Sequence, residues 1–119
     1  MFRLILDEML VKTHGALAAL FVDYEGETVA LTCDRDLSDH ALRVLGAYQV
    51  VYFDRLRAIC SRVSDGSPHR FKIEFDAMSV LSWDVKDGYS IVLLVDGSVN
   101  EGLAWRGLQK CRERLLEEM

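Results

Sequence analysis

The chain has 119 residues, a mass of 13.5 kDa and a formal charge of −5 from 14 basic and 19 acidic residues. Half of the residues are hydrophobic and 28% are charged, which excludes a disordered chain and predicts one domain over residues 1–119. The acidic balance argues against nucleic acid and anionic membrane as main partners. A hydrophobic share this high in so small a chain is a surplus that must be buried somewhere.

No stretch of the sequence is long enough to cross a membrane. The longest charge-free runs, residues 13–22 and 44–53, cover ten residues each, whereas a spanning helix needs about twenty. Acidic residues interrupt the first apolar stretch, so it does not resemble a secretion signal. The cysteines are odd in number and lack metal or redox spacing, which predicts buried thiols in a reducing cytoplasm. They are Cys33, Cys60 and Cys111.

The first predicted elements are a helix and a hairpin. The apolar face of the helix comprises Phe2, Ile5, Leu6, Met9 and Leu10. Gly15 suits the position after its last turn, where a left-handed conformation is often needed. The apolar run Ala16–Val22 and the returning run Thr28–Cys33 read as paired strands, and Gly26 between them is free to take a positive φ.

The longest predicted element is a helix of about 26 residues, which Asp36 can cap and which stops at the breaker of residues 64–68. Its apolar residues recur at spacings of three and four, and Val44 and Val51 widen the stripe that they form. The members of the stripe are Leu37, Ala41, Leu45, Tyr48, Tyr52, Leu56, Ile59 and Val63.

Three strands and a helix complete the pattern. Residues 71–75 (FKIEF) alternate strictly and predict an edge strand with one buried face. Residues 78–85 and 89–95 flank a Lys-Asp-Gly sequence that is typical of a hairpin turn. Ser98 and Glu101 form the capping box of a last helix. The apolar stripe of that helix is Ala104, Leu108, Cys111, Leu115 and Met119.

This order of elements predicts an α/β (α+β) fold: a five-stranded antiparallel sheet in a three-layer α/β/α sandwich. The strands of residues 16–22 and 90–95 are continuously apolar. We therefore expect them to be central and covered by helices on both faces.

The sequence holds no recognisable catalytic or metal-binding pattern. Residues 97–104 carry the two glycines of a phosphate-binding loop, but Leu103 and Ala104 stand where that motif needs Lys and Ser or Thr. The histidines, His14, His40 and His69, lie on different elements, and no nucleophile motif occurs. Catalytic groups need not be adjacent in sequence, so an enzyme stays open as an alternative. We predict a non-enzymatic protein without a cofactor or metal.

The middle of the long helix predicts a partner surface. Tyr48, Tyr52 and Phe53, with the valines around them, cover more than one stripe. The alternative is a fully buried helix, which is hard to achieve with 119 residues. The apolar edge strand of residues 71–75 also invites pairing with another chain, and an identical copy is the simplest candidate.

The element order and several local sequences resemble the roadblock/dynein light chain family, including its bacterial members of MglB type. These sequences are DYEGE at residues 23–27, VALTC at 29–33, VKDGY at 85–89 and IVLLV at 91–95. The resemblance extends from about residue 4 to the end of the chain, and order and spacing carry it more than any one motif. It implies a roadblock/profilin-like fold.

The resemblance further implies a homodimer, joined through the long helix and the edge strand, that serves as a platform for a Ras-like small GTPase. The expected dimer residues are Tyr48, Val51, Tyr52, Arg55, Phe71, Ile73 and Phe75. The expected GTPase-binding residues, on the polar side of the long helix, are Asp39, Arg43, Asp54 and Arg57. The last helix ends at Met119 without the C-terminal extension of some bacterial members, which puts a nucleotide-exchange role in doubt.

Two other functions stay open. One is a structural adaptor in a motor or membrane-associated complex, without GTPase contact. The other is a small-molecule sensor, since three-layer domains of this shape also hold ligands.

Overall fold

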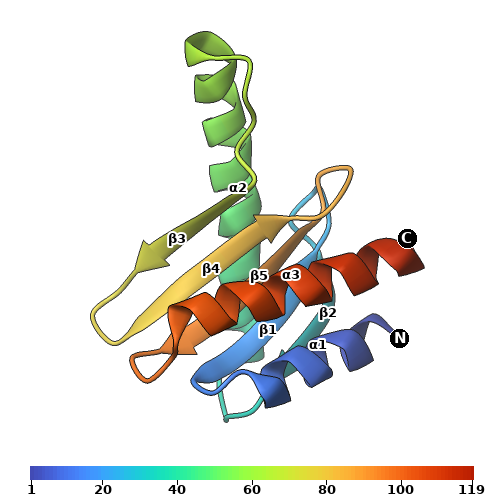
Figure 1. The fold of residues 1–119 in the computed structure, drawn as a ribbon, viewed down its shortest axis with the longest axis vertical. Coiled ribbons are helices and arrows are strands. Elements are labelled where there is room, and N and C mark those ends of the chain that lie inside the picture. The colour runs from blue at the N-terminus through green and yellow to red at the C-terminus, as the bar shows by residue number, and fades with distance from the viewer.

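The computed structural model describes residues 1–119, and its three helices and five strands follow the predicted order (Figure 1). The first half consists of α1 (Phe2–Lys12), β1 (Ala16–Val22), β2 (Thr28–Cys33) and α2 (Asp39–Val63). The second half consists of β3 (Arg70–Glu74), β4 (Met78–Asp84), β5 (Ser90–Asp96) and α3 (Glu101–Glu118). The bounds of β1 and β2 are those predicted from the sequence.

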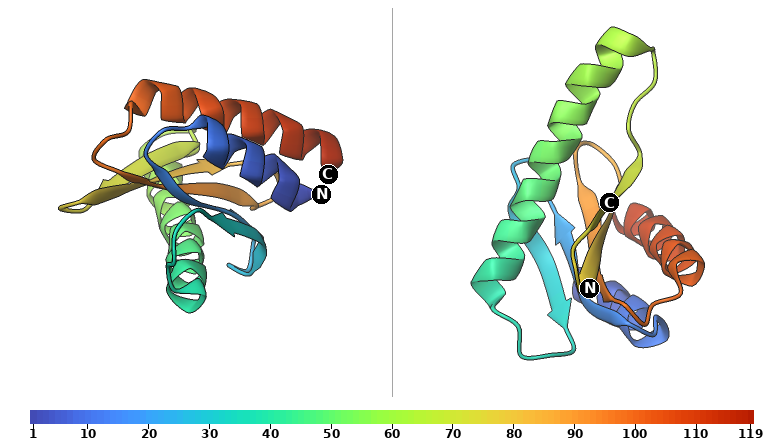
Figure 2. Two further views of the ribbon diagram at one scale, coloured as in Figure 1. Left: turned by 90° about the horizontal axis from the view of Figure 1, so that it is seen from below. Right: turned by 90° about the vertical axis from the view of Figure 1, so that its left-hand side faces the viewer.

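The strands form one antiparallel sheet in the order β2-β1-β5-β4-β3. Helices α1 and α3 cover one face of this sheet and α2 crosses the other (Figure 2). Every residue of β1 is buried, as is every residue of β5 except the last. The three-layer sandwich and the central position of the two apolar strands are therefore confirmed.

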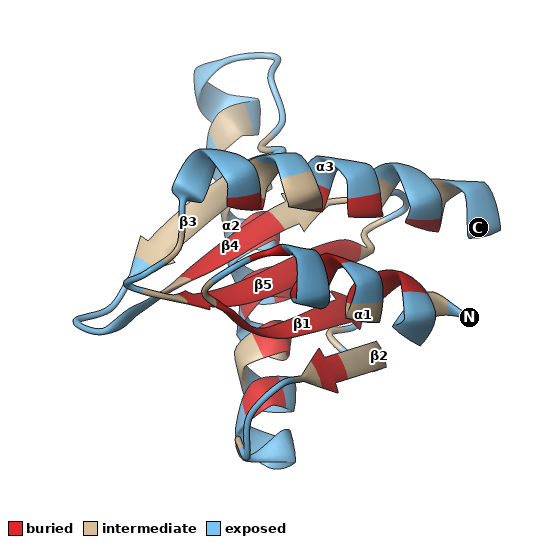
Figure 3. Cartoon of the chain, turned by 60° about the horizontal axis from the view of Figure 1, so that its bottom comes forward, coloured by how far each residue is buried: buried red, intermediate tan, exposed pale blue.

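The two faces of the sheet are not covered equally. The hydrophobic cluster between the sheet and the α1–α3 layer contains 16 buried residues, whereas the cluster beneath α2 contains nine. Buried residues concentrate in β1, β5 and β4 and on the inner sides of α1 and α3 (Figure 3). The α2 layer therefore has the smaller core, and much of that helix lies outside it.

Both predicted helix caps are wrong by two residues. Ser38, not Asp36, caps α2, and its Oγ accepts the backbone N–H of Ala41 at 3.1 Å. Asn100 caps α3 in place of Ser98. The predicted residues are suitable chemically, but a cap must immediately precede the first helical turn to reach its free N–H groups.

The edge strand β3 differs from the prediction of one buried and one exposed face. Its three middle residues, including Phe71 and Ile73, are all half-buried. Phe71 contacts α2 and Lys72 contacts α3, so both faces of the strand are partly covered. The strand also ends at Glu74, which leaves Phe75 beyond it and exposed.

The prediction of three buried thiols is correct only for Cys111, which lies in the α3 stripe. Cys33 and Cys60 are half-buried, because one ends the edge strand β2 and the other lies near the end of α2. None of the three helices combines the length and the apolar character that crossing a membrane requires.

Candidate interaction surface

The long helix α2 presents an apolar face to solvent. Its inner face consists of Leu42, Gly46, Gln49, Val50 and Phe53. Many members of the predicted apolar stripe lie outside, with Tyr48 54%, Ile59 57% and Val63 80% exposed. The second half of α2 also projects beyond the sheet (Figures 1 and 2). Large apolar side chains gathered on one exposed helix face are typical of a protein-binding surface.

The spacing on this outer face suits contact with a second helix. Val44, Tyr48, Val51 and Arg55 follow one another at intervals of four, three and four residues. Alternating intervals of four and three residues average 3.5 residues, the spacing that keeps a row of side chains facing a packed helix. We name these four residues the α2 seam.

Strand β3 lies beside the α2 seam and has an open edge. It pairs with β4 from Arg70 opposite Trp83 to Glu74 opposite Ser79, and no strand pairs with its other side. Backbone N–H and C=O groups on such an edge are free to bond another strand. The helix face and the strand edge thus form one continuous candidate surface.

Phe71 joins β3 to α2. Its ring lies 4.7 Å from that of Phe53 and 6.4 Å from that of Tyr52, both edge-on. Tyr52 in turn stacks on Tyr48 at 6.2 Å. Aromatic pairs at such distances add about 0.5–1.5 kcal/mol beyond the area that they bury. The β3 edge is therefore held against α2.

Four of the seven expected dimer residues line one shallow depression of about 300 Å³ together with Leu56. They are Tyr52, Arg55, Phe71 and Ile73. Tyr48 and Val51 continue the same face along α2, and both are exposed. Phe75 lies outside β3, so it does not belong to the paired part of the edge. The contact of all seven with a second copy stays a prediction.

The four residues expected to bind a GTPase form two separate ion pairs. Arg43 Nε lies 2.7 Å from Asp39 Oδ2, and Arg57 Nη1 lies 2.8 Å from Asp54 Oδ1. The pairs are about 22 Å apart along the helix, at 1.5 Å per residue. Exposed pairs of this kind contribute less than about 1 kcal/mol to stability, so the side chains remain free to exchange partners. Their role in binding stays a prediction.

A second cluster, which the sequence did not reveal, fixes β3 to α3. The guanidinium carbon of Arg70 lies 4.9 Å from the ring centres of both Trp83 and Trp105. Nearby, Lys72 Nζ lies 2.7 Å from Glu74 and 3.1 Å from Glu101, which raises the pKa of Lys72. These residues come from three elements, and no spacing in the sequence relates them.

The loop after β5 is closed by a carboxylate. Ser98 donates from its backbone N–H at 2.8 Å and from its hydroxyl at 2.6 Å to Asp96 Oδ1. These bonds lower the pKa of Asp96. A carboxylate therefore binds both donors of Ser98 in this loop. The chain has no group of three or more His, Cys, Asp or Glu side chains placed to hold a metal ion.

Comparison with solved structures identifies the fold. The gliding protein MglB from Thermus thermophilus matches with a TM-score of 0.87 and 18% identity, over 98% of this chain and 86% of that one. An MglB in a tetrameric arrangement gives the same TM-score and identity, over 98% and 85%. The roadblock/LC7 domain from Streptomyces avermitilis has a TM-score of 0.86 at 10% identity, over 95% and 92%.

Profilin II from Acanthamoeba castellanii matches more loosely, with a TM-score of 0.68 and 16% identity over 99% and 98% of the two chains. No protein-family model and no curated protein matches the sequence. The chain therefore has a roadblock-like fold, related in its architecture to profilin, and the resemblance seen in the sequence is confirmed at the level of the fold.

Proposed function

We propose that the protein is a non-enzymatic cytoplasmic homodimer of roadblock type that serves as a regulator or scaffold and binds a Ras-like small GTPase. One observation carries the proposal: in a roadblock-like fold, an exposed apolar helix face adjoins an open strand edge. The choice of a Ras-like GTPase as the partner rests on the roadblock resemblance. Self-association is in keeping with the tetrameric arrangement of one MglB.

A twofold axis beside β3 accounts for both halves of the surface. Two β3 edges paired across the axis join two five-stranded sheets into one, and each α2 seam packs on its counterpart. This arrangement covers the large side chains that α2 exposes, including Tyr48 and Ile59. Dimerisation thereby removes from water hydrophobic side chains that a single chain leaves exposed.

The dimer is tested by light-scattering mass with a matched pair of variants. The wild-type protein should have twice the 13.5 kDa chain mass. Val51→Lys places a charge in the α2 seam and should give monomers, as should Ile73→Lys at the β3 edge. Val11→Lys makes the same change on α1 at a side chain that is 84% exposed, and should leave the dimer intact. A wild-type monomer at micromolar concentration contradicts the proposal.

The GTPase is tested by pull-down with candidate Ras-like GTPases loaded with GTP or GDP. Binding should depend on the nucleotide, and Asp54→Lys should weaken it by removing one of the ion pairs on α2. Glu113→Lys reverses an exposed charge on α3, the opposite layer, and is the control. Absence of binding in both nucleotide states favours the adaptor function.

A further inference from the structure

A groove with a basic rim lies on the layer opposite the α2 seam. Helices α1 and α3 run antiparallel over the same face of the sheet (Figures 1 and 2), and a groove of about 340 Å³ lies between them. Ile5 and Met9 of α1 are buried and form part of its apolar lining. Leu103 of α3 lines it too and is 56% exposed.

The charges of the groove oppose those of the whole chain. Lys12 of α1 and Arg106, Lys110 and Arg114 of α3 line it, and Glu8 is the only acid among the lining residues. The lining therefore carries +3, which leaves −8 on the rest of a chain whose net charge is −5. The three α3 cations are four residues apart, so they follow one side of the helix with a rise of about 6 Å between them.

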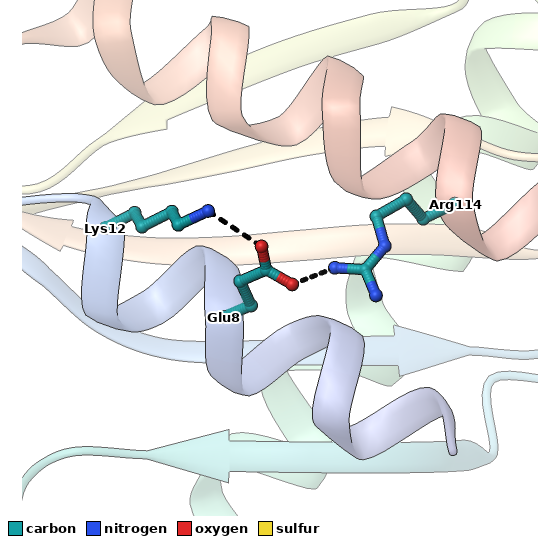
Figure 4. A network of polar contacts seen from close by, with 3 residues as sticks. All are labelled: Glu8, Lys12 and Arg114. Carbon is teal, nitrogen blue, oxygen red and sulfur yellow. Dashed lines mark hydrogen bonds and ion pairs between the residues drawn. The ribbon is translucent and has the colours of Figure 1, made fainter.

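Glu8 engages two of the four cations. It lies 2.7 Å from Lys12 Nζ on one side and pairs with Arg114 on the other (Figure 4). Arg106 and Lys110 have no carboxylate within 4 Å, although both line the groove. Two cations beside apolar lining are therefore unpaired.

We propose that this groove binds an acidic amphipathic segment of a partner protein. The row of cations spans about 12 Å and does not converge on one point, which suits a linear polyanion better than a single phosphate. The cations border a hollow with apolar lining, and a flat membrane surface cannot enter a hollow. An amphipathic segment satisfies both features, with acidic side chains along the α3 row and apolar ones against Leu103 and Met9.

This inference is independent of the proposed dimer. The groove lies on the α1–α3 layer, and the α2 seam lies on the other side of the sheet. A dimer formed through α2 and β3 leaves one groove open on each copy. Loss of the groove therefore changes partner binding without changing the oligomeric state.

The test measures fluorescence anisotropy of a labelled helical peptide that carries Glu at every fourth position and Leu along the adjoining face. Lys110→Glu should raise its Kd about tenfold, and added salt should weaken binding. Lys86→Glu makes the same change in an exposed turn outside the groove and should have little effect. Glu8→Gln removes the competing carboxylate and should lower the Kd, a gain that misfolding cannot produce.

Three results would overturn the proposal. The first is failure of the wild-type protein to bind the peptide. The second is equal weakening by Lys110→Glu and Lys86→Glu, which shows attraction by net charge alone. The third is co-sedimentation with phosphatidylserine vesicles, or binding of inorganic phosphate, that Lys110→Glu abolishes while peptide binding persists.

The apolar part of the groove is tested separately. Leu103→Ser should weaken peptide binding and leave the light-scattering mass unchanged.

Discussion

Ser82 of β4 donates a hydrogen bond from its hydroxyl to Gln49 Oε1 of α2 at 3.1 Å, and both residues are fully buried. The amide nitrogen of Gln49 donates in turn to the carbonyl of Leu45 at 3.2 Å. This polar link lies inside the smaller core. Because buried polar groups are costly when unpaired, the link favours one position of α2 across the sheet.

Ser82→Ala should lower the free energy of unfolding by about 1–3 kcal/mol, because it leaves the buried Gln49 oxygen without a donor. Gln49→Leu combined with Ser82→Ala removes both polar groups and should recover part of that loss. Urea unfolding of the two single variants and the double variant measures the coupling. Additive losses would show that the bond does not position the helix.

Sequence patterns predicted the elements of this fold well where the burial was uniform. Strand β1 is an apolar run that begins after Gly15, and Gly15 takes the expected positive φ of 90°. Helix starts were less accurate, since Asp36 and Ser38 are both good capping residues. The path of the chain before α2 decides between them, and local sequence does not encode that path.

The sequence predicts a partner surface on α2 but does not show which side of that helix faces the sheet. The inner face includes Gly46, which has no side chain, and Gln49, whose side chain is polar. A pattern of apolar residues therefore does not mark this face. A Cβ on Gly46 would lie 3.1 Å from side-chain atoms of Leu20 and Val22, so a larger residue at this position would require those side chains to shift. The Arg70 cluster and the α1–α3 groove were not predicted, because each is assembled from separate elements.

Gly88→Ala should destabilise the protein by more than about 1 kcal/mol. Gly88 has a φ of +83°, and a Cβ there would lie 2.7 Å from the Cβ of Tyr24. Gly97→Ala is the matched control, because an added methyl group there would have no atom within 4 Å and the φ of Gly97 is not positive. Thermal unfolding of the two variants compares them. Equal decreases in Tm for the two variants would mean that the tight turn before β5 does not require glycine at position 88.

Native thiol labelling should distinguish Cys111 from the other two cysteines. Burial raises the pKa of the Cys111 thiol to about 12, so it forms almost no thiolate at about pH 8. Cys33 and Cys60 are half-buried and should react with iodoacetamide first. Mass spectrometry of digested protein locates the label. Early modification of Cys111 without unfolding would contradict the packing of α3 on the sheet.

Glu8 of α1 pairs with Lys12 and with Arg114 of α3, and we call these contacts the Glu8 bridge. The bridge should make the attachment of α1 to α3 depend on pH. Lys12 and Arg114 lower the pKa of Glu8 below its ordinary value of 4.5. Its contribution to stability is therefore present above that value and is lost as the pH falls through the lower pKa of the folded state. The Tm difference between wild type and Glu8→Gln should be larger at about pH 7 than at about pH 3.

Glu113→Gln is the control for this prediction, because Glu113 lies on α3 and has no basic group within 4 Å. Its Tm difference from wild type should change little over the same pH range. High salt at neutral pH should reduce the effect of Glu8→Gln, since both partners of Glu8 are exposed and screened. If the Tm difference between wild type and Glu8→Gln is the same at neutral and acidic pH, the bridge does not hold the two helices together in solution.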